Sequence, residues 1–95
     1  MTNHTNSPKI RKALEAYRAA KAEFDVKQAE LVEHIEHTPI LVYADVHRRE
    51  SLTFRMKEAH SAKNVAEWEA STALWAYYKG KLSNREIMNI VATAL

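Results

Sequence analysis

Residues 8–39, "PKIRKALEAYRAAKAEFDVKQAELVEHIEHTP", decide the fold because they place apolar side chains along one side of a long helix. Beginning at Ile10, the pattern advances by alternating steps of four and three, which forms a single stripe on an α-helix. The stripe consists of Ile10, Leu14, Tyr17, Lys21, Phe24, Gln28, Leu31 and Ile35. Its two polar members, Lys21 and Gln28, are typical of residues that set register or oligomeric state rather than carry chemistry.

The ends of three helices are marked by capping residues. Ser7-Pro8 and Thr38-Pro39 each place a capping hydroxyl before a proline at the first helical position. Ser83 and Glu86 have the spacing of a capping box, and Lys79-Gly80 is typical of a helix C-terminus. These signals predict helices over residues 8–37, 39–79 and 83–94, with boundaries good to about 2–4 residues.

The second predicted helix has two dissimilar faces. One is lined by small residues, which allow another helix to approach closely. It consists of Ala59, Ala62, Ala66, Ala70, Ala73 and Tyr77, with Met56 and Leu74 at its margin. Trp68 and Trp75, seven residues apart, lie nearly opposite these alanines, together with Phe54, Val65 and Thr72. The first helix cannot cover both faces, so the tryptophans need another partner.

The fold class that follows is all-α, with a long antiparallel hairpin and a short C-terminal helix in one domain of residues 1–95. Residues 1–7 form a polar N-terminal tail. The third helix carries Ile87, Met88, Ile90, Val91 and Leu95 and is expected to fold back beside Trp75. It is roughly 18 Å long, whereas the second helix is roughly 60 Å long and is expected to be continuous or mildly kinked near Glu50-Ser51. Because packing supplies most helical stability, we expect a second copy or another protein to cover the remaining length.

Composition indicates a folded protein, and the absence of cysteine is compatible with a reducing compartment. The chain of 95 residues has no cysteine, one glycine and a formal net charge of +2. No segment has the length or hydropathy of a membrane span or of a signal peptide, so we expect a cytoplasmic location. Basic and acidic residues are nearly balanced in both halves, whereas a dedicated nucleic-acid binder usually has a more lopsided charge.

Neither a metal site nor an active site is expected. His34 and His37 lie one turn apart near Glu30 and Glu33, with His47 and Glu50 across the hairpin, but a zinc site needs three or four converging ligands. No glycine-rich loop, nucleophile elbow or catalytic Ser/His/Asp spacing is present. We therefore expect a protein without enzymatic activity and without a cofactor.

A basic cluster in the second helix raises the alternative of nucleic-acid binding. Arg48, Arg49, Arg55 and Lys57 could contact phosphates, in a hairpin dimer with aromatic residues stacking on unpaired bases. The simpler interpretation is a charged surface, with Arg48 and Arg55 paired to Glu23, Asp25 or Glu30 across the hairpin. A self-assembling structural subunit is a third hypothesis.

The leading hypothesis is a small module that binds another protein as an inhibitor, adaptor or assembly factor. Compact helical chains without cysteine are typical of bacterial or phage accessory proteins, including those that target a host defence or DNA-processing machine. Aromatic residues and arginine dominate the binding energy of protein interfaces. The predicted partner-binding residues are therefore Phe54, Trp68, Trp75, Tyr78, Arg48, Arg49, Arg55 and Lys57.

Overall fold

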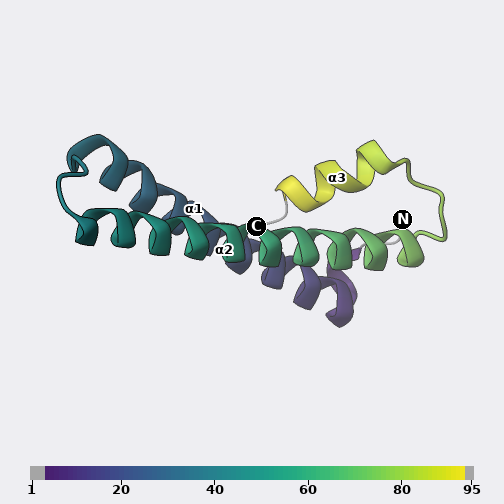
Figure 1. Cartoon of the computed structure of the whole chain (residues 1–95). Helices are drawn as coiled ribbons and strands as arrows, with labels where there is room; N and C mark the ends of the chain where they lie inside the picture. Colours follow the sequence, from purple (N-terminus) through teal and green to yellow (C-terminus); the bar gives the residue numbers. More distant parts are fainter. Residues whose placement is uncertain (1–3, 94–95) are drawn as a thin grey trace.

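The computed structural model describes residues 4–93 and confirms the all-α hairpin (Figure 1). Helix α1 (Pro8–His37) and helix α2 (Tyr43–Tyr77) pack against each other, and helix α3 (Asn84–Thr93) folds back beside α2. A short 3-10 helix, His4–Asn6, precedes α1 and forms part of the predicted polar tail. No strand occurs within residues 4–93. Residues 1–3, residue 94 and Leu95 lie outside the described part of the chain.

The molecule is a rod that is thicker at one end. Its extents are 60 × 22 × 17 Å and its radius of gyration is 17.6 Å, against about 12 Å for a compact chain of this length. At the broad end, residues 4–22 and 63–93, α3 lies on one side of α2 and the start of α1 on the other (Figure 1). In the hairpin half, residues 23–62, only α1 and α2 run together.

The hydrophobic core lies at the broad end. All three helices contribute buried side chains to one cluster, which contains Ile10, Leu14, Tyr17, Ala66, Ala70, Leu74, Ile87 and Val91. The predicted small-residue face of α2 is buried at Ala59, Ala66 and Ala70, while Ala62 is exposed. These alanines let the larger side chains of α1 approach closely, as ridges-into-grooves packing requires.

The predicted stripe of α1 is buried only in part. Leu14, Lys21, Gln28 and Ile35 are spaced seven residues apart and share a flank of α1, yet only Leu14 is buried. Leu14 belongs to the cluster that includes Ile87 and Val91 of α3. Because α3 is only ten residues long, its cover does not extend along that flank, and Ile35 remains 53% exposed.

Two of the three predicted helix starts are confirmed. The Ser7 hydroxyl accepts a hydrogen bond from the backbone N–H of Ile10 at 3.4 Å. In α3, Glu86 N–H donates to the Ser83 hydroxyl, while the Glu86 carboxylate accepts from Ser83 N–H, both at 3.2 Å. This reciprocal pair is a capping box.

The predicted start of α2 at residue 39 is wrong, because α2 begins four residues later. Thr38 is the extended C-cap residue of α1, as the steric demand of a following proline favours. The capping function belongs to Asp45, whose carboxylate accepts hydrogen bonds from the backbone N–H groups of Leu41 and Val42. From Tyr43, α2 runs unbroken through Ser51 to Tyr77.

The predicted end of α2 is confirmed to within two residues. Lys79 and Gly80 both adopt left-handed backbone conformations, with φ of 54° and 75°. The N–H of Gly80 donates to the carbonyl oxygen of Trp75 at 3.1 Å, which closes the last turn. A side chain at Gly80 would meet the Trp75 ring at 3.4 Å, so the reversal towards α3 passes directly beneath this tryptophan.

Candidate functional site

Both tryptophans lie on the surface of the broad end. Trp68 is 68% exposed and Trp75 is 55% exposed, although α3 packs beside the same stretch of α2. The core of α2 here consists of Ala66, Ala70 and Leu74, on the face turned towards α1. Helix α3 therefore flanks the two tryptophans without burying them.

The first groove runs between α2 and α3 and has a volume of about 290 Å³. The Ser71 hydroxyl contacts the sulfur of Met88 at 3.7 Å and so ties the two helices together. The groove is lined by Trp68, Ser71, Thr72, Trp75, Asn84, Ile87 and Met88. Met88 is 41% exposed, so the rim offers a flexible thioether beside two aromatic rings.

The second groove runs between α1 and α2 and is larger, at about 410 Å³. It is lined by Lys9, Lys12, Ala13, Ala16, Trp68, Glu69, Thr72, Ala73 and Ala76. Trp68 and Thr72 line both grooves, so Trp68 stands between two adjacent apolar depressions. A ligand in either groove would therefore contact Trp68.

The broad end is also the basic end of the molecule. Residues 4–22 carry five basic side chains and one acidic side chain, and residues 63–93 carry four basic and three acidic. The hairpin half, by contrast, carries five basic and eight acidic. The larger groove has Lys9 and Lys12 in its lining and only one acidic residue, Glu69, so its lining carries a net positive charge.

The remaining predicted contact residues lie elsewhere. Phe54, 63% exposed, lines a shallow groove of about 250 Å³ in the hairpin half, together with Arg49 and Lys57. Arg48 and Arg55 are exposed, and no ion pair joins α1 to α2 within residues 4–93. The expected pairing of these arginines with Glu23, Asp25 or Glu30 is therefore wrong.

Two of the predicted contact residues make hydrogen bonds within the chain. Arg49 is half-buried and donates to the backbone oxygens of His34 and Thr38 and to Nδ1 of His34. The Tyr78 hydroxyl lies 2.7 Å from Nδ1 of His4. Their assignment to a partner surface stays a prediction, and the structure gives both residues an internal role.

Sequence reasoning left the hairpin turn out of the predicted binding residues. Leu41 is 79% exposed and Tyr43 is 81% exposed, the highest values among large apolar side chains in the described region. The apolar run that follows Pro39 could have indicated a binding surface, since exposed runs of consecutive apolar residues are unusual unless they have a function. Lys9 and Lys12 were also missed, because their place beside Trp68 depends on how α1 packs on α2.

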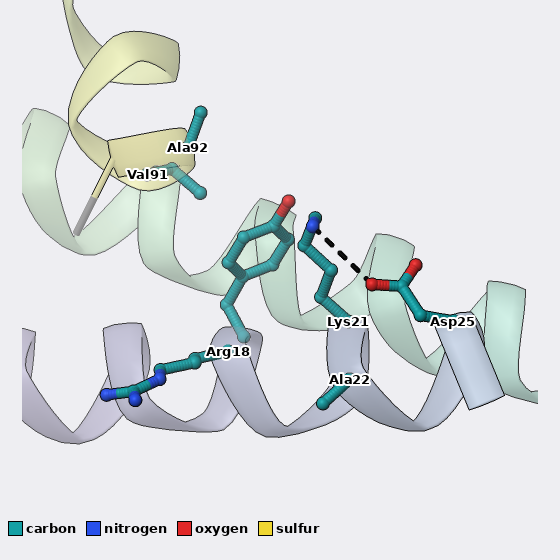
Figure 2. Close-up of a pocket in the computed structure, with 7 residues that line it drawn as sticks. Arg18, Lys21, Ala22, Asp25, Val91 and Ala92 are labelled. Atoms are coloured by element: carbon teal, nitrogen blue, oxygen red, sulfur yellow. Dashed lines mark ion pairs between the residues drawn. The ribbon is translucent and has the colours of Figure 1, made fainter. Parts of the chain in front are cut away.

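A third groove, of about 190 Å³, lies where the end of α3 meets α1 (Figure 2). Val91 and Ala92 of α3 line it from one side, whereas the Arg18 side chain of α1 points away from them. The Lys21 ammonium points towards Asp25, to which it is ion-paired at 3.6 Å. This ion pair closes the groove on the side of the hairpin half.

The described histidines and carboxylates do not converge on a common point. Within residues 4–93, no group of three or more of these side chains is placed to hold a metal ion. His34 is hydrogen-bonded to Arg49, and His60 packs against the ring of Phe24. No helix in the described region has an apolar stretch long enough to cross a membrane. The absence of enzymatic activity stays a prediction.

Comparison with protein-family models, with curated proteins and with solved structures found no significant match to this chain.

Proposed function

We propose that this protein is a non-enzymatic module that binds another protein at the Trp68 and Trp75 surface of its broad end. The observation that carries the proposal is the exposure of both tryptophans beside two apolar grooves. Exposing large aromatic side chains to water is unfavourable, and binding another molecule removes that cost. Tryptophan is also strongly enriched at the hot spots of protein interfaces.

The grooves suit an apolar segment with acidic neighbours. Each groove is a few hundred Å³, enough for one or two large side chains and not for a whole domain. The alanines of the larger groove leave room for a helix, which would bind as amphipathic helices bind apolar grooves elsewhere. Lys9 and Lys12 favour carboxylates at the edge of that helix. Such a module acts by occupying its partner's surface, as an inhibitor, adaptor or assembly factor does.

The test is a comparative pull-down that uses the tagged full-length protein, Trp68→Ala and Val65→Ala. Val65 is a matched control, because it is an exposed apolar residue of α2 that lines none of the grooves described above. A partner retained by wild type and by Val65→Ala, and lost with Trp68→Ala, supports the proposal. Equal capture by all three proteins would contradict it.

Parallel samples treated with nuclease separate this proposal from nucleic-acid binding. Capture that disappears after nuclease treatment, and that weakens steeply with salt, would assign the function to the basic residues instead. Retention that does not depend on nuclease and varies little with salt is the result expected for apolar grooves.

A further inference from the structure

The hairpin turn exposes an apolar surface that the proposed function does not use. We define the tip patch as Val32, Ile35, Ile40, Leu41, Val42 and Tyr43, each of which is at least 44% exposed. Together these six residues expose on the order of 700 Å², backbone included, which is comparable with the largest apolar patch on a typical monomer. The tip patch lies at the opposite end of the rod from α3 (Figure 1).

The hairpin half contains too few buried apolar side chains to be stable by itself. Leu31, Leu52 and Ala59 are its only buried apolar residues in the described structure, spread over two helices without a third layer. Helices in water depend on tertiary packing for most of their stability. A surface that adds apolar contacts along this half would therefore stabilise the chain itself.

Charges in the hairpin half are segregated between the two helices. Residues 23–37 of α1 carry five acidic side chains and one basic side chain, whereas residues 43–57 of α2 carry four basic and two acidic. Arg49 is already held by α1, but Arg48, Arg55 and Lys57 form no ion pair within residues 4–93, so their charges are available to a second copy. Two copies can satisfy them by placing α1 of each against α2 of the other.

We propose that the tip patch is covered by a second copy of this chain, related by a two-fold axis that runs along the rod. This axis brings the two tips together and sets the acidic part of α1 against the basic part of the partner's α2. If fully covered, the two patches bury at most on the order of 1,400 Å² in total, within the range of stable interfaces. The broad ends, with their tryptophan grooves, would then point away from the joined tips.

The Lys21–Asp25 ion pair marks where this contact ends on α1. By helical spacing it lies on the same flank of α1 as Gln28, Val32 and Ile35. Figure 2 shows it next to the end of α3. Beyond it α3 already meets α1, where Val91 and Ala92 line a groove together with Arg18. The two copies therefore diverge at this point and form a V-shaped dimer.

The first experiment is sedimentation velocity of the full-length protein over a range of concentrations. Wild type is expected to sediment as a dimer that dissociates on dilution, and Leu41→Ser/Tyr43→Ser is expected to weaken dimerisation at least tenfold. The matched control is Val65→Ser, which removes an apolar residue that is 56% exposed and lies outside the tip patch. Circular dichroism verifies that each variant keeps its helices. A wild-type monomer at every concentration, or a double variant as dimeric as wild type, overturns the proposal.

A cysteine placed at the tip tests the symmetry. The chain has no native cysteine, so Leu41→Cys introduces a single thiol. If the tips meet, mild oxidation links two copies through residue 41, and Val65→Cys on the outer surface of α2 stays unlinked. If Leu41→Cys links no faster than Val65→Cys, the tip-to-tip arrangement is wrong.

A charge reversal gives an independent readout: Arg55→Glu should weaken the dimer and Glu33→Arg in the same chain should restore it.

Discussion

Arg49 of α2 donates a hydrogen bond of 2.9 Å from Nη2 to the carbonyl oxygen of Thr38, the residue that closes α1. The same nitrogen donates to the carbonyl oxygen of His34 at 3.3 Å. Carbonyls at a helix C-terminus lack partners and carry a partial negative charge, which a cation stabilises. The end of one helix of the hairpin is thus capped by a side chain of the other.

Replacing Arg49 should destabilise the fold. Arg49→Ala is expected to lower the free energy of unfolding by roughly 1–2 kcal/mol, because backbone oxygens of α1 lose a charged donor. Urea unfolding followed by circular dichroism measures the change. Arg48→Ala, one residue earlier and exposed, should alter stability by less than about 0.5 kcal/mol. Equal effects of the two substitutions would show that the cap contributes nothing.

The contact between His4 and Tyr78 should hold the 3-10 helix against the end of α2. Its length is 2.7 Å, and it joins residues 74 positions apart in the chain. Tyr78→Phe is expected to cost about 0.5–1.5 kcal/mol, the usual net value of one such bond. In a double-mutant cycle, adding His4→Ala to Tyr78→Phe should cause little further loss. Fully additive losses would indicate that the two side chains act independently.

Substitutions at the two left-handed residues of the turn after α2 should change the stability of the fold in opposite directions. Gly80→Ala is expected to destabilise by about 1 kcal/mol, because a left-handed conformation is strained for any residue with a Cβ. Lys79→Gly should instead stabilise by up to about 1 kcal/mol, as it removes that strain. Thermal unfolding monitored by calorimetry distinguishes the two. The same sign for both changes would be incompatible with this backbone.

The structure makes different predictions for neighbouring large residues of α2. Leu74 is fully buried, so Leu74→Ala should cost about 2–5 kcal/mol through the cavity it leaves. Trp68→Ala removes a larger side chain, yet it should change the free energy of unfolding by less than about 1 kcal/mol because the ring is 68% exposed. Chemical denaturation of both variants gives the comparison. A collapse of the Trp68→Ala fold would place this residue in the core and remove the basis of the proposed function.

Local chemistry made most of the helices predictable. Ser7 and the pair Ser83 and Glu86 cap helices through bonds to neighbours in the chain, so their signals could be read correctly from spacing alone. Thr38-Pro39 has the same pattern, but the helix start it predicts is wrong. Thr38 instead closes α1, and its carbonyl oxygen accepts a hydrogen bond from Arg49 of α2. The competing cap, Asp45, is also local, but its effect depends on how the chain leaves α1.

The candidate site was predictable in part. The position of Trp68 and Trp75 opposite the alanines followed from helical spacing, and so did their need for another partner. Helical spacing also predicted that α3 folds back beside Trp75, but it could not show that both tryptophans would stay more than half exposed. Tyr78 and Arg49 looked equally available in the sequence, but contacts with His4 and with α1 give them internal roles.

By itself, the sequence determined the helical class, the hairpin and the face of α2 that packs on α1. These depend on periodicity and capping, which act over a few residues. Only the tertiary structure decided that Leu14 is buried while Ile35, on the same flank of α1, is exposed. The physical reason is length. Helix α3 contains ten residues against thirty-five in α2, so it completes the core at one end and leaves the other end as a two-layer hairpin with an apolar tip.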